Sequence, residues 1–325
     1  MPPLLTISDL HVEFHGRDRK RVRALNGVNL RVSAGEVTGL LGESGCGKST
    51  LARTLLQMLP DNARITKGAV EFEGRDLLKL RGRELQQVRG ARISLIPQDP
   101  GLALNPFMKV GKQIAEVLRA HNDWQWKRCC EEAEALLSVV HLDGAVRRVF
   151  DAYPHQLSGG QQQRVVIAQS ISCRPALVIA DEPTSSLDST TEKEILAIFG
   201  ELKSQHRVAL LFITHDPKIL SGLADRVAIM YAGRIVEESS AAFALAQPLH
   251  PYAKALISCI PPERRLAAGE RLATIPGSSP DAEALSPGCN FAPRCESRKE
   301  LCNQKAPCVT QMPDARLVEC FLYER

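Results

Sequence analysis

The chain has 325 residues, of which 44% are hydrophobic and 24% charged, and its formal net charge at pH 7 is +4. This length allows one large domain and a smaller one, and the mild charge does not indicate a nucleic-acid-binding protein. The N-terminus lacks the pattern of a signal peptide, and no apolar run reaches the roughly 18–20 residues that span a bilayer. We therefore expect a cytosolic protein, in which a disulfide framework is disfavoured.

The first part of the chain is predicted to be mostly β-structure. Residues 4–14 alternate as a strand does, and β character continues through residues 23–42. The basic run Arg17–Arg21 between them is predicted to be a solvated turn. Apolar residues at helical spacing then predict a helix from Ser49 to Leu59, which the following Pro60 would close.

Residues 99–150 are predicted to be mostly helical, most clearly at 110–121 and 127–140. Residues 176–181 and 208–215 have the length and β-branching of buried parallel strands. The helical pattern at 189–203 lies between these two strands and completes a βαβ unit. Residues 240–325 are rich in Pro, Gly and Cys and show little periodicity, which indicates an irregular extension.

The segment GESGCGKS, from Gly42 to Ser49, is the phosphate-loop pattern G-x(4)-G-K-[S/T] between a predicted strand and a predicted helix. Its glycines allow successive N–H groups to face phosphate oxygens, and the helix N-terminus adds partial positive charge. Lys48 is placed to reach the β- and γ-phosphates of a nucleotide, and Ser49 to ligate Mg²⁺. The ATP-binding candidates in this loop are Gly42, Glu43, Ser44, Gly45, Cys46, Gly47, Lys48, Ser49 and Thr50.

Two further segments contain residues suited to nucleotide binding or hydrolysis. The apolar strand LVIAD ends at Asp181, where open α/β sheets bind their ligands, and Asp181 would hold the Mg²⁺ shell. Glu182 follows it and is placed to act on the attacking water. The segment Ser158-Gly159-Gly160 opens a helix with a hydroxyl and two glycines, which is a second anion-binding arrangement.

These motifs occur in an order that makes the family recognisable. GESGCGKST, PQD (97–99), LSGGQQQR (157–164), LVIADEP, SSLD (185–188) and His215 follow one another as in the ATP-binding subunits of ABC transporters, which the sequence resembles from about Leu4 to its end. The segments QDPGLALNP, HPYAKALISCIP and IPGSSPDAEALSPGCNFAPRC resemble those of the oligopeptide, dipeptide and nickel importers.

The resemblance implies a fold of the α/β class: a P-loop NTPase (ABC ATPase) core with a helical subdomain and a small irregular Cys-rich C-terminal extension. The implied boundaries are 1–98 and 166–238 for the nucleotide-binding core with its N-terminal β subdomain, 99–165 for the helical subdomain with the signature motif, and 239–325 for the extension.

The resemblance also implies roles for individual residues. The catalytic set is Glu182, His215, Lys48 and Gln98, and the Mg²⁺ ligands are Ser49, Gln98 and Asp181. Gln98 also contacts ATP, Phe14 stacks on the adenine, and Asp188 makes a dimer contact. The signature residues Ser158, Gly159, Gly160 and Gln161 contact the ATP of a partner subunit.

Clustered cysteines near the C-terminus form the last candidate site. In a reducing cytosol such cysteines favour metal or cluster ligation over disulfides. The resemblance to the peptide-importer tail selects Cys289, Cys295, Cys302 and Cys320 as ligands of a [4Fe–4S] cluster and leaves Cys308 out. Zn²⁺ at the same ligands and free or oxidised thiols are the alternatives.

The implied function is that of an ATP-hydrolysing subunit that energises an ABC importer of dipeptides or oligopeptides, with ATP and Mg²⁺ as cofactors. It would lie peripherally on the cytoplasmic face of the plasma membrane. Its expected partners are two transmembrane permease subunits, a second ABC ATPase (a related chain rather than a second copy) and, indirectly, an extracytoplasmic solute-binding protein, with no nucleic acid. The alternatives are import of nickel or another small solute, and a soluble ABC ATPase that takes no part in transport.

Overall fold

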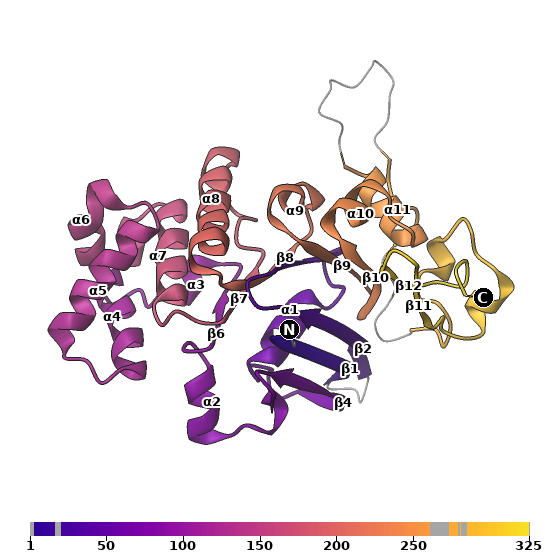
Figure 1. Ribbon diagram of the computed structural model, residues 1–325, viewed down its shortest axis with the longest axis horizontal. Helices are drawn as coiled ribbons and strands as arrows, with labels where there is room; N and C mark the ends of the chain where they lie inside the picture. The colour runs from indigo at the N-terminus through magenta and orange to yellow at the C-terminus, as the bar shows by residue number, and fades with distance from the viewer. Residues whose placement is uncertain (1–2, 17–20, 261–272, 279, 281–284, 325) are drawn as a thin grey trace, which may run out of the picture. The chain divides into compact units, whose positions relative to one another are not determined.

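The computed structural model describes residues 3–16, 21–260, 273–278, 280 and 285–324 (Figure 1). The chain divides into two compact units. Unit 1 comprises Met1–Val32, Thr38–Leu78 and Thr214–Arg325, and unit 2 comprises Ser33–Val37 and Lys79–Ile213. The predicted basic turn lies largely outside the described residues, since 17–20 are not among them. Within the described ranges, no helix combines the length and the apolar character that crossing a bilayer requires.

An antiparallel sheet in unit 1 has the strand order β2-β1-β4-β5 (Figure 1). Its strands are β1 (Leu5–His15), β2 (Arg21–Val32), β4 (Ala63–Phe72) and β5 (Arg75–Asp76). β1 lies between β2 and β4, so that Leu5 is opposite both Val32 and Phe72, and all three side chains are buried. The strand predicted from the alternation of residues 4–14 is therefore confirmed as β1.

The second sheet of unit 1 has the order β11-β12-β10-β9-β3. Its strands are β3 (Val37–Leu41), β9 (Arg226–Tyr231), β10 (Arg234–Ser240), β11 (Val309–Gln311) and β12 (Leu317–Glu319). β3 and β9 are parallel, whereas β12 pairs antiparallel with β10 and β11 pairs antiparallel with β12. Two strands of the expected irregular extension thus complete this sheet. A strand of three residues is too short to display a period of two, so the sequence pattern did not reveal them.

The helices of unit 1 are α1 (Lys48–Leu55), α9 (Pro217–Leu223), α10 (Ala241–Ala246) and α11 (Pro251–Ser258), with short 3₁₀ turns at Ala292–Arg294 and Glu300–Asn303. The prediction that the first helix continues to Leu59 is wrong, because the helix ends at Leu55. Gln57 has a φ of +50°, and the N–H of Met58 donates to the carbonyl of Arg53 at 2.8 Å. This left-handed residue and its hydrogen bond terminate the helix before Pro60.

The strands of unit 2 form a parallel arrangement in the order β8-β7-β6. They are β6 (Ile93–Ile96), β7 (Leu177–Asp181) and β8 (Ala209–Thr214), and every residue of β7 and β8 is buried. Helix α8 (Ser189–His206) connects β7 to β8, which confirms the predicted βαβ unit. The rings of Phe199 on α8 and Phe212 on β8 meet edge to face with their centroids 5.2 Å apart, so this helix packs directly on the strands.

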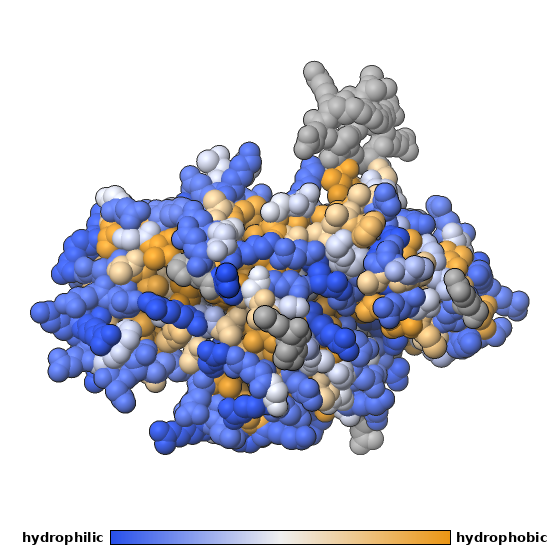
Figure 2. Space-filling view, viewed as in Figure 1, coloured by the Kyte–Doolittle hydropathy of each residue, from blue (hydrophilic) through white to orange (hydrophobic). Residues whose placement is uncertain are grey.

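The remaining helices of unit 2 are α2 (Gly82–Val88), α3 (Pro100–Ala103), α4 (Val110–His121), α5 (Trp126–Val139), α6 (Val146–Asp151) and α7 (Gly159–Ile171). Helices α4 to α7 pack against one another, as the magenta helices in Figure 1 show. Their visible outer face is mostly hydrophilic in Figure 2, with small hydrophobic areas between the polar side chains. The helices predicted at 110–121 and 127–140 are confirmed as α4 and α5.

Candidate nucleotide-binding site

The phosphate loop lies between the end of β3 at Leu41 and the first residue of α1, Lys48. Gly47 has a φ of +111°, and a Cβ atom there would approach the carbonyl oxygen of Ala24 to 2.5 Å. A residue with a side chain would therefore be strained at this position, which favours glycine. Lys48 is 4% exposed, and its Nζ donates to the carbonyl oxygens of Gly42 at 2.7 Å and Glu43 at 3.0 Å. The ammonium group is therefore held inside the loop.

The other loop residues differ in exposure. Ser44 and Gly45 are exposed, whereas Ser49 and Thr50 are half-buried in the first turn of α1. Cys46 is buried, and its Sγ lies 3.9 Å from Lys48 Nζ. Burial raises the pKa of the Cys46 thiol, and the nearby Lys48 offsets this only in part. The thiol is accordingly neutral near pH 7 and serves to fill space beside the loop.

In unit 2, the candidate Mg²⁺ ligand Asp181 and the candidate catalytic residue Glu182 lie at the end of β7. Asp181 is the last residue of this strand and is 6% exposed. Glu182 has a φ of +48°, a conformation that a residue with a side chain seldom adopts, and its N–H donates to Ile213 O at 3.0 Å. Gln98 Nε2 lies 3.4 Å from Glu182 Oε2 and 3.5 Å from Ser185 Oγ. The fold thus brings together two of the four predicted catalytic side chains.

The signature segment begins α7 in unit 2. Ser158 is the N-cap residue: its Oγ accepts from the N–H of Gln161 at 3.3 Å, and Gln161 Oε1 accepts from the N–H of Ser158 at 3.1 Å. Ser158 and Gly159 are exposed, and Gly160 is half-buried. The helix start that the sequence predicted is present, and its exposed N-terminus can accept an anion from outside the chain.

The remaining predicted residues lie as follows. His215 directly follows β8 and is exposed, and Phe14 is half-buried on β1. Asp188 is the N-cap of α8 and accepts from the N–H groups of Thr190 and Thr191 at 3.0 and 3.1 Å. Hydrogen bonds from Thr191 lower the pKa of Asp188, and the bond from the Thr191 hydroxyl group contributes most to this shift. Its predicted dimer contact stays a prediction, while its helix cap is a local role that the sequence analysis did not assign.

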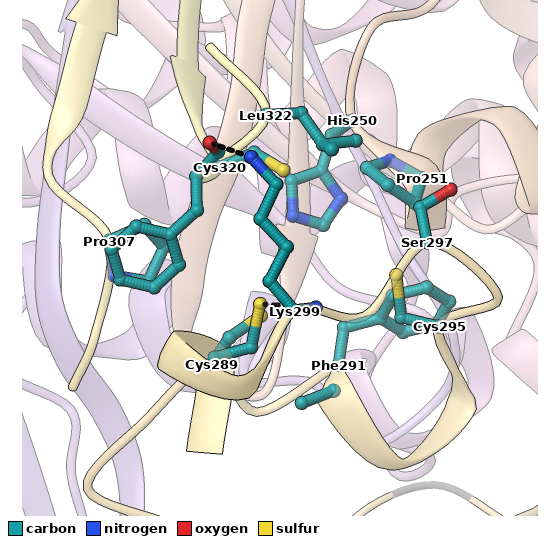
Figure 3. A pocket seen from close by; sticks show the side chains of 13 residues that line it. His250, Pro251, Cys289, Phe291, Cys295, Ser297, Lys299, Pro307, Cys320 and Leu322 are labelled. Carbon is teal, nitrogen blue, oxygen red and sulfur yellow. Dashed lines mark hydrogen bonds between the residues drawn. The ribbon is translucent and has the colours of Figure 1, made fainter. Parts of the chain in front are cut away.

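Four cysteines of the C-terminal extension line one pocket of unit 1. Cys289, Cys295 and Cys320 surround it together with His250 and Lys299 in Figure 3. Cys302 also lines the pocket, whereas Cys308 is exposed and does not.

The local chain path explains why the cysteine-bearing segments meet. A Cβ atom at Gly288 would overlap the carbonyl oxygen of Cys302, and the N–H of Cys289 donates to that same oxygen at 2.8 Å. Burial raises the pKa of Cys289 to about 11 and raises those of Cys295 and Cys320 as well.

The pocket does not present a ready site for a single metal ion. Across the part of the chain that the structure describes, no three His, Cys, Asp or Glu side chains are grouped so that they could hold one. The predicted ligand set is thus gathered in one place, but neither the [4Fe–4S] cluster nor its zinc alternative is shown.

Two family models match the chain. A model described as "ABC transporter" covers residues 25–185, and one described as "Oligopeptide/dipeptide transporter, C-terminal region" covers residues 236–302. Among solved structures, the dimeric structure of a post-hydrolysis state of the ATP-binding cassette MJ0796 bound to ADP and Pi is similar, with a TM-score of 0.65 and 25% identity, over 73% of this chain and 98% of that chain. This similarity supports the α/β ABC ATPase fold.

Relatives resemble the chain over nearly its whole length. The oligopeptide transport ATP-binding protein OppD of Escherichia coli (strain K12) is 42% identical, over 98% of this chain and 93% of OppD. The dipeptide transport ATP-binding protein DppD of Bacillus subtilis (strain 168) is 39% identical, over 100% of this chain and 96% of DppD. The phosphate loop, the carboxylates after β7 and the C-terminal region thus agree with these similarities, and the chain belongs to the ATP-binding subunits of ABC transporters, in the oligopeptide/dipeptide transporter family.

Proposed function

We propose that this chain binds and hydrolyses ATP to energise the import of oligopeptides or dipeptides. The observation that carries the proposal is the phosphate loop, in which the buried ammonium group of Lys48 is fixed by the carbonyls of Gly42 and Glu43. The names of the relatives, oligopeptide and dipeptide transport ATP-binding proteins, support the class of solute.

In the proposed reaction, Lys48 and the loop N–H groups bind the β- and γ-phosphates, and the residues that would hold Mg²⁺ are Ser49, Asp181 and Gln98. When bound, Mg²⁺ neutralises charge on the phosphate oxygens. Glu182 orients a water and accepts its proton while the water oxygen bonds to the γ-phosphorus and the bond to ADP breaks. The amide of Gln98 beside Glu182 supports this role, because it can orient the carboxylate.

The remaining assignments belong to the same proposal: Phe14 stacks on the adenine, and His215 contacts the γ-phosphate. The exposed N-terminus of α7 supports a dimer in which Ser158 approaches the ATP of a second ABC ATPase, a related chain rather than a second copy. Asp188 would contribute to that dimer contact.

The segment after Gln98 is proposed to contact the permease subunits. Leu102 and Phe107 follow it closely and are 87% and 89% exposed, which is unusual for large apolar side chains and typical of an interaction surface. The chain would accordingly work peripherally at the cytoplasmic face of the membrane, next to permeases that receive solute from an extracytoplasmic binding protein.

The division into core, helical subdomain and extension at the predicted boundaries is part of this proposal.

The cysteine pocket is proposed to hold a [4Fe–4S] cluster through Cys289, Cys295, Cys302 and Cys320. Their common pocket and the exclusion of Cys308 support this ligand set. A tetrahedral zinc ion needs all four sulfur atoms about 2.3 Å from one point, whereas a four-iron cluster takes one thiolate on each iron and keeps them farther apart. When bound, the cluster would cross-link the loop segments of the extension.

The proposed function can be tested with the assembled transporter. The chain is purified with its permeases and partner ATPase, reconstituted in liposomes, and ATP hydrolysis is followed with the solute-binding protein present. We expect stimulation by short peptides and peptide uptake that requires ATP. Stimulation by Ni²⁺ and not by peptides would select the nickel alternative, and an ATPase that associates with no permease would favour a function outside transport.

A further inference from the structure

Glu43, the second residue of the phosphate loop, is contacted by two residues from the C-terminal part of the chain. Its N–H donates to Tyr252 Oη at 3.0 Å. Its carboxylate accepts two parallel hydrogen bonds from Arg294, at 2.8 Å from Nη1 and 3.1 Å from Nη2. Together with the bond from Lys48 Nζ to its carbonyl, these contacts engage all three polar parts of Glu43.

Arg294 is itself firmly placed. Its side chain is 6% exposed, against 26% for Glu43. Its Nε donates to the carbonyl of Pro276 at 2.8 Å, and Nη1 lies 3.4 Å from Tyr231 Oη. A guanidinium group with partners on Nε and both Nη atoms has little freedom to rotate away, so the paired hydrogen bonds fix the direction of the Glu43 carboxylate.

The same segment forms a wall of the cysteine pocket. Arg294 ends the 3₁₀ turn Ala292–Arg294 and precedes Cys295 directly. Phe291 lines the pocket and packs against the ring of Tyr252, with centroids 5.4 Å apart. The phosphate loop is thus connected to the pocket by two short routes, one through Arg294 to Cys295 and one through Tyr252 to Phe291.

We infer that Arg294 is a positioning residue for the phosphate loop, which it holds through Glu43, and that this contact makes nucleotide affinity depend on the segment that carries the pocket cysteines. The inference rests on the proposed nucleotide site. In the proposed site Lys48 also binds the phosphates, so the place of Glu43 depends chiefly on its contacts with Arg294 and Tyr252. A loop that spends part of its time in other conformations binds with an affinity reduced by the fraction that remains competent.

The main experiment measures the Kd of a non-hydrolysable ATP analogue for the full chain by calorimetry. We expect R294M and E43Q each to raise the Kd about tenfold, because each breaks a charged hydrogen-bonded pair. R294K should have a smaller effect, since it keeps the charge but loses the two parallel bonds. The Kd of the double variant R294M/E43Q should not exceed the higher of the two single-variant Kd values, because both substitutions remove the same contact.

The matched control is R298M, which removes an exposed arginine three residues after Cys295. It should leave the Kd unchanged. If R294M does not fold, as judged by circular dichroism, E43Q tests the same contact from the loop side. Wild-type Kd values for R294M and E43Q, or equal weakening by R294M and R298M, would overturn the inference.

The dependence on the cysteine segment is tested by C295S in two backgrounds, with iron and zinc measured in every preparation. We expect C295S to raise the Kd in the otherwise wild-type chain and to add nothing to R294M. Equal weakening in both backgrounds would contradict a route through Arg294. K48A distinguishes a failure of the proposed nucleotide site from a failure of the role of Arg294. If K48A also binds ATP like wild type, the proposed nucleotide site is itself wrong. If K48A is the only variant that weakens binding, only the role of Arg294 is rejected.

Discussion

The side-chain amide of Gln98 lies 3.4 Å from the carboxylate of Glu182, although 84 positions separate the two residues in the chain. Glu182 occupies this place with a φ of +48°, a backbone conformation that costs free energy in a residue other than glycine. Strain retained at a residue that follows a buried strand supports a functional role for that residue.

Replacing Glu182 by Gln should therefore preserve ATP binding while lowering turnover by about 10²–10⁴-fold, the range typical of a lost general base. Phosphate release and equilibrium ATP binding should both be measured. E116Q is a matched control, because Glu116 is exposed on α4, and it should turn over normally. Undiminished phosphate release by E182Q would remove Glu182 from the catalytic set.

Lys48→Ala should act on binding itself. The variant removes the only side-chain charge that the phosphate loop directs into its interior, and we expect the Kd for ATP to rise roughly 10–100-fold, the range of a hydrogen bond to a charged group. Calorimetry measures the Kd, and a thermal unfolding curve checks that the buried site has not collapsed. An unchanged Kd in K48A would contradict the placement of Lys48 in the proposed nucleotide site.

The cap of α8 gives a prediction about pH. Asp188→Ala should lower the melting temperature by about 2–4 °C, because the N–H groups of Thr190 and Thr191 lose their acceptor. Hydrogen bonds from Thr191 hold the pKa of Asp188 below its ordinary value of 3.8, so its carboxylate stabilises the fold above that pH and this contribution is lost as the pH falls through the folded-state pKa.

The melting temperatures of wild type and D188A should consequently differ at pH 7 and converge in strong acid. Scanning calorimetry at a series of pH values tests this. A difference that persists unchanged at the lowest pH at which the protein folds would show that the cap does not depend on the charge of Asp188.

Anaerobic purification should yield a chain with about four iron atoms and four sulfides, the composition of a [4Fe–4S] cluster, and a visible absorption band. C295S should lose the metal, whereas C308S should keep it, because Cys308 is exposed and lies outside the pocket. Stoichiometric zinc without sulfide would select the alternative metal. Metal lost in C308S but kept in C320S would refute the ligand set.

Substituting Ser for both Leu102 and Phe107 should weaken co-purification with the permeases at least several-fold and leave ATP binding by the isolated chain unaffected. Their exposure of 87% and 89% means that neither side chain contributes much to the core. M58S is the control, since Met58 is 51% exposed and belongs to another segment. Equal permease recovery for the wild type, the Leu102/Phe107 double variant and M58S would exclude this surface as the docking site.

Features whose residues are contiguous in the chain could be predicted without the structure. The phosphate loop needs only its glycines, Lys48 and the adjoining strand and helix, and all of these lie between Val37 and Leu55. The buried strands β7 and β8 and the helix between them were likewise predictable, because long apolar runs and a helical period are local signals.

Contacts between residues that are distant in the chain became known from the fold alone. Arg294 and Glu43 are 251 positions apart, and no local pattern pairs one arginine with one glutamate among 41 basic and 37 acidic residues. In the same way, β12 joins β10 through backbone hydrogen bonds that depend little on the identity of its three side chains. Local structure follows from neighbouring residues, whereas these contacts depend on how the whole chain packs. For that reason the sequence predicted the phosphate loop but not the contact of its Glu43 with Arg294.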